Sequence, residues 1–219
     1  MLSRDIMELR FERPEGFSFF AGQFVQFQVP ALGGEVLRPY SVSSTPADNY
    51  LEFCLKVLPD GKASQYFVQL GIGERAYISD AKGVFICHSE HQSSKMFIAT
   101  GAGLAPIISM IEDRLSRSPD KLKLLFGVRT SEDIFWTDRL NELMGNYKNL
   151  NYQLTLSQPT DDWQGFRGRV SEHLVSLFPA AYNLLPEFYI CGSAPMVKDV
   201  RALLLKQKMN TKSIHWEIF

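Results

Sequence analysis

Thr100-Gly101-Ala102-Gly103-Leu104-Ala105-Pro106 lies in this sequence where a predicted strand, Lys95–Thr100, meets a predicted helix. The helix is indicated by apolar residues at three- and four-residue spacing: Leu104, Ile107, Ile108, Ile111 and Leu115. Glycines at such a junction let the backbone approach a phosphate, and the amino end of the helix favours its negative charge. The loop has Pro106 where a third glycine would stand, so an ordinary tight turn stays open as an alternative.

After this loop the sequence keeps alternating between predicted strands and predicted helices. Strands are predicted at residues 122–128, 152–156, 188–191 and 214–219. Helices are predicted after Ser131 and at residues 171–178 and 196–209. This alternation predicts a doubly wound α/β domain, which is a parallel sheet with helices on both faces.

Before the loop the sequence has the pattern of short antiparallel strands. Residues 24–29 and 50–58 alternate apolar with polar side chains, and glycine-containing turn signals follow each of them. Further strands are predicted at 36–44, 75–78 and 84–87, and a short helix at 64–70 with Ser64 as its N-cap. We expect an antiparallel β-barrel that ends in the polar linker 88–94. The predicted domains are therefore a β-barrel at 1–92 and an α/β domain at 93–219.

The composition argues against several classes of protein. The 219 residues are 45% hydrophobic and carry a net charge of −1, so no strong field favours nucleic acid or an anionic membrane. Cys54, Cys87 and Cys191 lie too far apart for a Cys-x-x-Cys metal site, and their odd number argues against a disulfide framework. No apolar run approaches the ~18 residues of a membrane span, and the charged N-terminal segment does not resemble a signal peptide. The expectation is a cytoplasmic monomer without a metal site.

Two motifs of the barrel carry groups that suit a large anionic ligand. Arg38-Pro39-Tyr40-Ser41 offers a guanidinium that forks onto phosphate oxygens, a ring that can lie flat on a conjugated system, and a hydroxyl. Gly61-Lys62-Ala63-Ser64 is a glycine turn that enters a helix, whose free N–H groups can bind phosphate. Each motif also has a structural alternative. The first could be a strand with a core tyrosine and a solvated arginine, and the second could be an ordinary capped helix.

Two segments near the C-terminus end at the same predicted sheet edge as Thr100. Cys191-Gly192 ends a strand, and Pro195, beside Met196, takes a favoured first-turn position of the next helix. Because the carboxyl ends of parallel strands share one edge, Thr100 and Cys191 are expected to border one crevice. Glu217 and Phe219 point to one side of the last strand, where Phe219 could cover a flat ring. A buried core thiol and a core-filling phenylalanine are the alternatives.

In their order and spacing, these motifs together resemble the ferredoxin–NADP reductase superfamily over nearly the whole chain. Within it, the chain is most similar in kind to the NADH-dependent reductase components of bacterial oxygenases. The resemblance implies a FAD-binding barrel followed by a NAD(P)-binding α/β domain. It also implies a reaction in which NAD(P)H reduces FAD, and the electrons then pass singly to an acceptor.

The resemblance further implies roles for particular residues. Arg38 would hold the FAD pyrophosphate, Tyr40 would lie against the flavin ring, and Ser41 would hydrogen-bond near its N5 atom. The other residues implied to contact FAD are Pro39, Leu55, Lys56 and Val57 through their backbone, Gly61, Lys62, Ala63, Ser64 and Phe219. Those implied to contact the dinucleotide are Thr100, Gly101, Gly103, Pro106, Cys191, Gly192, Pro195 and Met196. Ser41, Cys191 and Glu217 are the predicted catalytic residues.

The choice between NADH and NADPH depends on the residues that follow the 152–156 strand. They are Ser157-Gln158-Pro159, whereas relatives that use NADPH commonly have Ser-Arg there. A 2′-phosphate needs an arginine or lysine beside it. The missing arginine favours NADH, although Arg129, after the preceding strand, could take its place.

The electron acceptor is expected to be a separate molecule. Many oxygenase reductases carry a [2Fe–2S] domain with a Cys-x4-Cys-x2-Cys run, which this sequence lacks. A ferredoxin, a flavodoxin, an oxygenase component or a small molecule would then accept the electrons. Two alternatives stay open, an electron-transfer subunit without activity of its own and a free-flavin reductase. The phosphate-type segment 61–64 argues against the latter.

Overall fold

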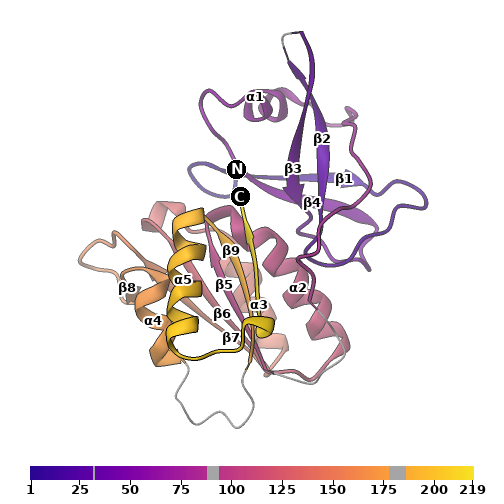
Figure 1. Ribbon diagram of the computed structural model, residues 1–219. Helices are drawn as coiled ribbons and strands as arrows, with labels where there is room; N and C mark the ends of the chain where they lie inside the picture. Colours follow the sequence, from indigo (N-terminus) through magenta and orange to yellow (C-terminus); the bar gives the residue numbers. More distant parts are fainter. Residues whose placement is uncertain (32, 88–93, 178–185) are drawn as a thin grey trace.

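The computed structural model describes residues 1–31, 33–87, 94–177 and 186–219, and it shows two domains that stack on each other (Figure 1). Antiparallel strands and one helix form the first domain, and a parallel sheet between layers of helices forms the second. Of the predicted linker 88–94, residues 88–93 lie outside the described part of the chain. The domain division at 92/93 therefore stays a prediction.

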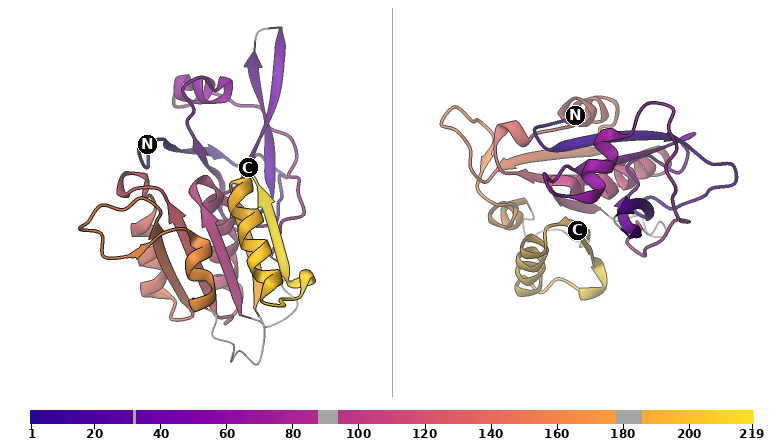
Figure 2. Two further views of the ribbon diagram at one scale, coloured as in Figure 1. Left: turned by 60° about the vertical axis from the view of Figure 1, so that its left-hand side comes forward. Right: turned by 90° about the horizontal axis from the view of Figure 1, so that it is seen from above.

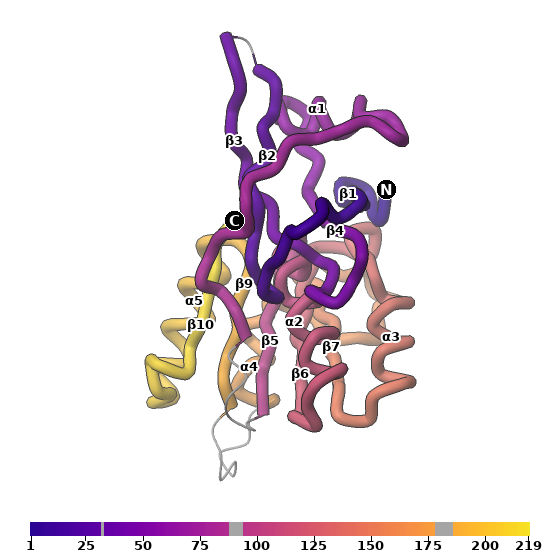
Figure 3. The backbone as a smooth tube through the Cα atoms, turned by 90° about the vertical axis from the view of Figure 1, so that its right-hand side faces the viewer, coloured from indigo at the N-terminus to yellow at the C-terminus, as the bar shows by residue number. Residues whose placement is uncertain are grey.

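The first domain consists of two strand pairs that enclose one core. β1 (Ile6–Glu12) pairs with β4 (Tyr50–Lys56), and β2 (Phe24–Ala31) pairs with β3 (Gly34–Ser41), each antiparallel. A single bridge between Val42 and Phe53 joins the two pairs. The alternating apolar residues of β2 point into the core, which α1 (Lys62–Gln69) closes with Phe67. The β2–β3 hairpin extends away from the second domain (Figure 3).

The second domain is built on six parallel strands in the order β10-β9-β5-β6-β7-β8. Their bounds are β5 Lys95–Thr100, β6 Leu122–Val128, β7 Leu150–Leu156, β8 Phe166–Arg167, β9 Glu187–Gly192 and β10 Ile214–Ile218. The chain adds strands outward from β5 to β8 and then returns to the other side of β5 with β9. This reversal of strand order opens a crevice beyond the carboxyl ends of β5 and β9, where ligands of such sheets bind.

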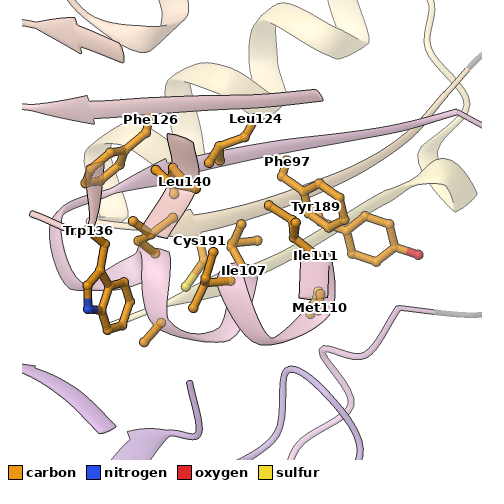
Figure 4. Close-up of a cluster of buried hydrophobic side chains, with 14 of the residues drawn as sticks. Phe97, Ile107, Met110, Ile111, Leu124, Phe126, Trp136, Leu140, Tyr189 and Cys191 are labelled. Carbon is orange, nitrogen blue, oxygen red and sulfur yellow. The ribbon is translucent and has the colours of Figure 1, made fainter. Parts of the chain in front are cut away.

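Helices cover both faces of this sheet (Figure 2). α2 (Leu104–Arg117) and α3 (Thr137–Asn146) lie on one face, and α4 (Val170–Leu177) and α5 (Ala194–Lys206) lie on the other. Successive strand residues point to opposite faces, so Phe97, Tyr189 and Cys191 pack in the α2 layer shown in Figure 4. Their neighbours Ile98 and Ile190 pack against α5. Short 3₁₀ turns at Gly101–Gly103, Ser131–Asp133 and Thr211–Ser213 complete the domain.

The predicted fold class, an antiparallel β-barrel domain followed by a doubly wound α/β domain, is confirmed, with four local corrections. The predicted strand 75–78 is only a single bridge at Ile78. α1 begins at Lys62 with Gly61 as its N-cap, so the prediction of Ser64 as N-cap was wrong. Residues 84–87 form no strand, and the side chain of Val84 is 91% exposed, so no neighbour supports pairing there. The two-residue strand β8 was not predicted, because so short a segment carries no alternation.

Candidate active site

A cleft of about 420 Å³ lies where the carboxyl edge of the sheet meets the β domain. Thr100, Gly101, Arg129, Ser157, Pro195, Met196 and Phe219 line it, as do residues of the β domain that include Lys56. The structure thus gathers eight of the predicted site residues in one cavity. The predicted ligand crevice at the sheet edge is a cavity shared by both domains.

The turn Gly101–Gly103 forms one wall of the cleft, and its glycines are required there by geometry. Gly101 has φ 52°, in the left-handed region that favours glycine. A Cβ at Gly103 would lie 2.6 Å from the carbonyl carbon of Cys191 and 2.9 Å from Gly192 N, so the turn sits directly on β9. No side chain caps the amino end of α2. Gly103 and Pro106 are buried and do not line the cleft, so they shape the wall without facing the ligand.

Thr100 presents a polar atom that needs a partner. Its Oγ1 is buried and has no hydrogen-bond partner among the described residues. Gly192 gives it room, because a Cβ there would collide with Thr100 Oγ1 and Met196 Cε. Buried hydroxyls are nearly always hydrogen-bonded, so this atom suits a polar group of a bound ligand.

Cys191 lies behind this wall and is buried to 2% exposure. Burial, followed by the nearby charge of Glu217, raises the pKa of its thiol far above the usual value. The protonated thiol is a poor nucleophile, so Cys191 can act in packing and positioning but not by covalent attack. Cys191 and Gly192 back the cleft without lining it.

The end of β10 adds a carboxyl and an aromatic side chain to the site. Glu217 pairs with Cys191 in the β9–β10 register, and burial raises the pKa of its carboxyl from 4.5 to about 7. Phe219 lines the cleft with its side chain 60% exposed, and its N–H donates to the carbonyl of Gly192 at 3.4 Å. Both residues therefore stand at the boundary between the two domains.

On the β domain, the Arg38–Ser41 motif lies outside the cleft, on the surface that β3 shares with α1. The half-buried ring of Tyr40 packs edge-on against Phe27 at 5.9 Å and Phe67 at 5.5 Å. Burial raises the pKa of the Tyr40 hydroxyl, and the neighbouring charge of Arg38 opposes that shift. Arg38 and Pro39 are exposed, and the Arg38 guanidinium donates to its neighbour's carbonyl at 2.9 Å. Its remaining N–H groups are available for a phosphate.

The amino end of α1 completes this surface. No side chain caps it, so backbone N–H groups of its first turn, at Lys62, Ala63 and Ser64, face outward from the helix end. The Ser64 hydroxyl accepts the N–H of Leu58 at 2.8 Å, which fixes the turn around Gly61 and leaves its own proton to donate. Arg38 and this helix end are two groups of the β domain whose chemistry suits an anion.

Beyond the Val42–Phe53 bridge, β3 and β4 pair with different strands, and of these two only β4 reaches the cleft, with Lys56. β3 continues in its pairing with β2, and β4 continues in its pairing with β1. The Leu55 side chain is buried in the core of the β domain, and its backbone contact with a flavin stays a prediction. Lys56 reaches the cleft and pairs with Asp5 at 2.9 Å, while Val57 N donates to the Asp5 carbonyl at 2.7 Å.

A continuous set of neighbours links the predicted catalytic residues across the domain boundary. Ser41 pairs with Phe24 in the β2–β3 register. A Cβ at Gly83 would lie 3.1 Å from the Phe24 ring and 4.0 Å from Glu217 Oε1. Glu217 in turn pairs with Cys191. Successive neighbours therefore connect Ser41 of the β domain with the sheet edge of the α/β domain.

The structure adds residues that the sequence analysis missed. Arg169, between β8 and α4, lines the cleft beside Arg129 and Ser157, whereas Gln158 does not line it. The other missed lining residues are Arg4, Asp5, Ile6, Ala102, Gly127, Val128, Asp133, Phe135, Thr155, Gly168, Val170, Ser171, Ser193 and Asp199. Gly127 and Thr155 lie near the carboxyl ends of β6 and β7, so the rule of a shared carboxyl edge could have found these two.

Comparison with known proteins assigns the two domains separately. Residues 1–86 match the model of the oxidoreductase FAD-binding domain, and residues 97–202 match that of the oxidoreductase NAD-binding domain. The chain is therefore an oxidoreductase with one domain for each of these cofactors.

Individual relatives make the assignment more specific. The chain is 36% identical over 211 residues to ferredoxin–NADP reductase B of Sorangium cellulosum, covering 92% of this chain and 86% of that protein. It is 28% identical to the ferredoxin–NAD(P)(+) reductase component of naphthalene 1,2-dioxygenase/salicylate 5-hydroxylase systems from a Ralstonia species, covering 99% of this chain and 65% of that one. The chain belongs to the ferredoxin–NADP reductase superfamily.

Solved structures agree with this assignment. The cytochrome P450 reductase of Amycolatopsis superposes with a TM-score of 0.91 at 26% identity, over 100% of this chain and 66% of that one. A ferredoxin NADP+ reductase from Neisseria gonorrhoeae, with bound FAD and NADP, gives a TM-score of 0.82 at 26% identity, over 98% and 92% of the two chains. The present chain spans about two thirds of several of these relatives.

The residues present fit both cofactors. Arg38 and the uncapped end of α1 suit the phosphates of FAD, and the partly buried Tyr40 ring suits its flavin. The unpaired Oγ1 of Thr100 and the open turn at Gly101 suit a dinucleotide at the sheet edge.

No helix among the described residues is long and apolar enough to cross a membrane. The same residues contain no group of three His, Cys, Asp or Glu side chains placed to hold a metal ion.

Proposed function

We propose that this chain oxidises NAD(P)H through bound FAD and delivers the electrons to a separate acceptor. The observation that carries the proposal is the set of neighbours from Ser41 through Phe24, Gly83 and Glu217 to Cys191, which spans the domain boundary. It brings a flavin-type motif and a dinucleotide-type sheet edge to one place. Such an arrangement serves to hold two flat rings within about 3–3.5 Å of each other.

Each residue of the site has a role that follows from its position. Bound FAD supplies the chemistry of taking two electrons from a nicotinamide and releasing them one at a time. Tyr40 supports one face of the flavin, and Ser41 donates a hydrogen bond at its edge. Thr100 Oγ1 holds the polar group of the nicotinamide, and the small Gly192 leaves room for its ring. Phe219, exposed at the cleft, would border the flavin and leave room for the nucleotide.

The carboxyl of Glu217 is suited to hold a proton at this boundary. Burial raises its pKa to about 7, so near neutral pH it exists in both the protonated and the charged form. A group whose pKa lies near the working pH transfers protons most effectively. Glu217 is therefore proposed to exchange a proton during the reaction, whereas Cys191, which stays a thiol, is proposed to position the nicotinamide.

The nucleotide is proposed to be NADPH rather than the NADH favoured by the sequence alone. That preference depended on Gln158 in place of an arginine, and Gln158 does not line the cleft. Arg129 and Arg169 do line it, beside Ser157, and within the described ranges neither guanidinium has a hydrogen-bond or ion-pair partner. Two free guanidinium groups at one rim form a site for a 2′-phosphate.

An Arg129→Ala, Arg169→Ala double variant tests the nucleotide preference. We expect kcat/KM for NADPH to fall by at least about 100-fold, since each of the two arginines contributes a charged hydrogen bond of about 1.5–3 kcal/mol. The kcat/KM for NADH, which has no 2′-phosphate, is expected to change by less than about threefold. Equal losses with both nucleotides would contradict the assignment of the two arginines to the 2′-phosphate.

The acceptor is proposed to be a small redox protein of the ferredoxin type or an oxygenase component. The support comes from relatives whose names describe ferredoxin reductases and the reductase component of dioxygenase and hydroxylase systems. The decisive measurement loads the purified chain with FAD and follows flavin bleaching by NADPH without oxygen, then electron transfer to ferredoxins, flavodoxins and ferricyanide. A chain that retains no FAD, or whose FAD is not bleached by either nucleotide, would overturn the proposed function.

A further inference from the structure

The contact between the two domains includes a buried ion network centred on Arg139 of α3. Its Nη1 lies 2.7 Å from Glu52 Oε1 on β4, and its Nε and Nη2 lie 2.6 and 2.7 Å from the two oxygens of Glu112 on α2. The side chain of Glu52 is 0% exposed and also accepts from Arg10 at 2.8 Å and from Ser43 Oγ at 3.0 Å. Arg10 also lies 3.6 Å from Glu8, so the network contains two arginines and three carboxylates, and Arg139 joins one carboxylate from each domain.

Trp136 fixes the backbone that carries Arg139. It is the N-cap of α3 with φ 56°, a left-handed conformation that is uncommon for a bulky residue and costs about 1–3 kcal/mol. Its Nε1–H donates to Glu8 of β1 at 2.9 Å, and the Arg139 guanidinium lies 4.9 Å from its ring centroid. Figure 4 shows Trp136 at the edge of the α2-layer core, with its ring toward the β domain. The strained backbone thus aims both side chains at the β domain.

The elements that Arg139 joins are those that carry the two halves of the site. β4 runs from Glu52 to Lys56 in the cleft, about 13 Å at 3.3 Å per residue. α2 runs from the Gly101–Gly103 turn to Glu112. Arg139 Nη2 also lies 3.5 Å from the carbonyl of Ser43, which follows Ser41 by two residues. The next carbonyl, that of Ser44, accepts a hydrogen bond from Ser109 Oγ of α2 at 2.6 Å. A displacement at Arg139 would therefore shift flavin strands against the dinucleotide turn.

We propose that Arg139 is a positioning residue for the reaction, which sets the offset between the flavin strands and the dinucleotide turn through Glu52 and Glu112. This inference rests on the proposed function of the site. Arg139 touches neither cofactor, so it acts through the elements it joins. Ring-to-ring transfer needs a separation of about 3–3.5 Å, and a misplacement of about 1 Å can slow a reaction by about 100-fold. The bidentate geometry suits this role, because an arginine fork holds two carboxylates at fixed angles.

The test separates positioning from stability with two variants of the FAD-loaded chain. Arg139→Met is expected to retain FAD and to keep its apparent Kd for NADPH within about threefold, because neither binding surface contains Arg139. Its limiting rate of flavin reduction at saturating NADPH is expected to fall at least about tenfold, and the long-wavelength absorbance of the nucleotide–flavin complex is expected to weaken. Arg117→Met, which removes an exposed ion pair within α2, is the matched control and should keep the wild-type rate.

An Arg139→Met, Glu52→Gln double variant decides between the two explanations. In Arg139→Met, the buried Glu52 keeps only the exposed Arg10 as its charged partner. Glutamine removes this buried charge, so the thermal stability lost in Arg139→Met is expected to recover in part while the limiting rate stays low. A limiting rate that recovers together with stability, or a wild-type rate in Arg139→Met, would overturn the proposal. If Arg139→Met does not fold, Glu52→Gln alone must show the slowed limiting rate, and a wild-type rate there overturns it equally. A wild-type chain that binds FAD but is not reduced by either nucleotide would overturn the proposed function instead.

Discussion

Glu217 combines an ionisable carboxyl with a half-buried position between Gly83 and Cys191. Burial raises its pKa from 4.5 to about 7, so the folded state binds this proton more tightly than the unfolded chain does. The free energy that this proton adds to folding is fully present below pH 4.5. It is lost as the pH rises from 4.5 to about 7, and above that pH the group causes no further change in stability. The charged form of Glu217 at the domain boundary therefore lowers the stability of the folded protein.

Replacing Glu217 by glutamine is expected to remove this pH dependence. The wild-type Tm should fall more steeply from pH 4.5 to about pH 7 than that of Glu217→Gln, because the amide does not ionise. Thermal unfolding of the FAD-loaded proteins at several pH values in this window measures the difference. Glu15→Gln, at an exposed loop carboxyl, should follow the wild-type curve. Parallel curves for Glu217→Gln and the wild type would show that burial does not shift this carboxyl.

Single residues of the site differed in how far the sequence could reveal them. Thr100, Ser157 and Phe219 follow strands directly, and parallel strands end at one edge, so their place in the cleft could be predicted. Arg169 could not be recognised in the same way, because it follows the two-residue strand β8. Arg139 carried no signal at all, since its partner Glu52 is 87 residues away in the chain and only the packing of two domains brings them together.

The turn Gly101–Gly103 with α2 is the element on which the dinucleotide wall depends. A side chain at Gly103 would meet backbone atoms of Cys191 and Gly192, which cannot move without shifting β9. Gly145 in α3 offers the opposite case, since a Cβ there would meet nothing within 4 Å. Gly103 is therefore required for the close approach of the turn to β9, whereas Gly145 stands at a helix position where another residue would fit.

Gly103→Ala is expected to destabilise the protein by about 1–3 kcal/mol and to weaken NADPH binding, because the turn must move off β9. Its FAD content should stay close to wild type, since the FAD surface belongs to the other domain. Gly145→Ala is expected to stabilise by about 0.5–1 kcal/mol through the helix preference of alanine. Urea unfolding and nucleotide titration measure both effects. Unchanged nucleotide affinity in Gly103→Ala would contradict the close approach to β9.

The two domains also differed in how well their elements could be predicted. β6, with the continuous apolar run of a strand buried on both faces, was predicted at its observed bounds, Leu122–Val128. In the β domain, residues 75–78 and 84–87 were expected to be strands, but only Ile78 and Lys82 bridge to β2. An isolated bridge needs no periodic sequence, so propensity and alternation cannot locate it. The closing side of the β domain is therefore determined by tertiary contacts.

The contact between the two domains combines a buried polar network with apolar packing, in which Ile6, Cys54 and Phe85 of the β domain join the core of the α2 layer. Buried charge pairs add little net stability when complete, but the loss of one partner destabilises by about 3–5 kcal/mol. Glu52 has two arginine partners, one from each domain, so it couples the folding of the two domains. The exposed pairs of Arg4 with Glu132 and Asp133 also cross the boundary, but exposed pairs contribute about 0–1 kcal/mol each.

Intrinsic probes can follow this coupling, because each reports one domain. Trp136, Trp163 and Trp216 are the three tryptophans of the chain, and all lie in the α/β domain. Release of FAD reports the β domain. In wild-type protein we expect tryptophan fluorescence and FAD release to give one coincident urea transition, the sign of a two-state unit. Glu52→Ala leaves Arg139 and Arg10 without their shared carboxylate, so FAD release should then occur at lower urea than the tryptophan transition. Coincident transitions in Glu52→Ala, with a midpoint equal to that of the wild type, would show that the two domains are held together by contacts other than this network.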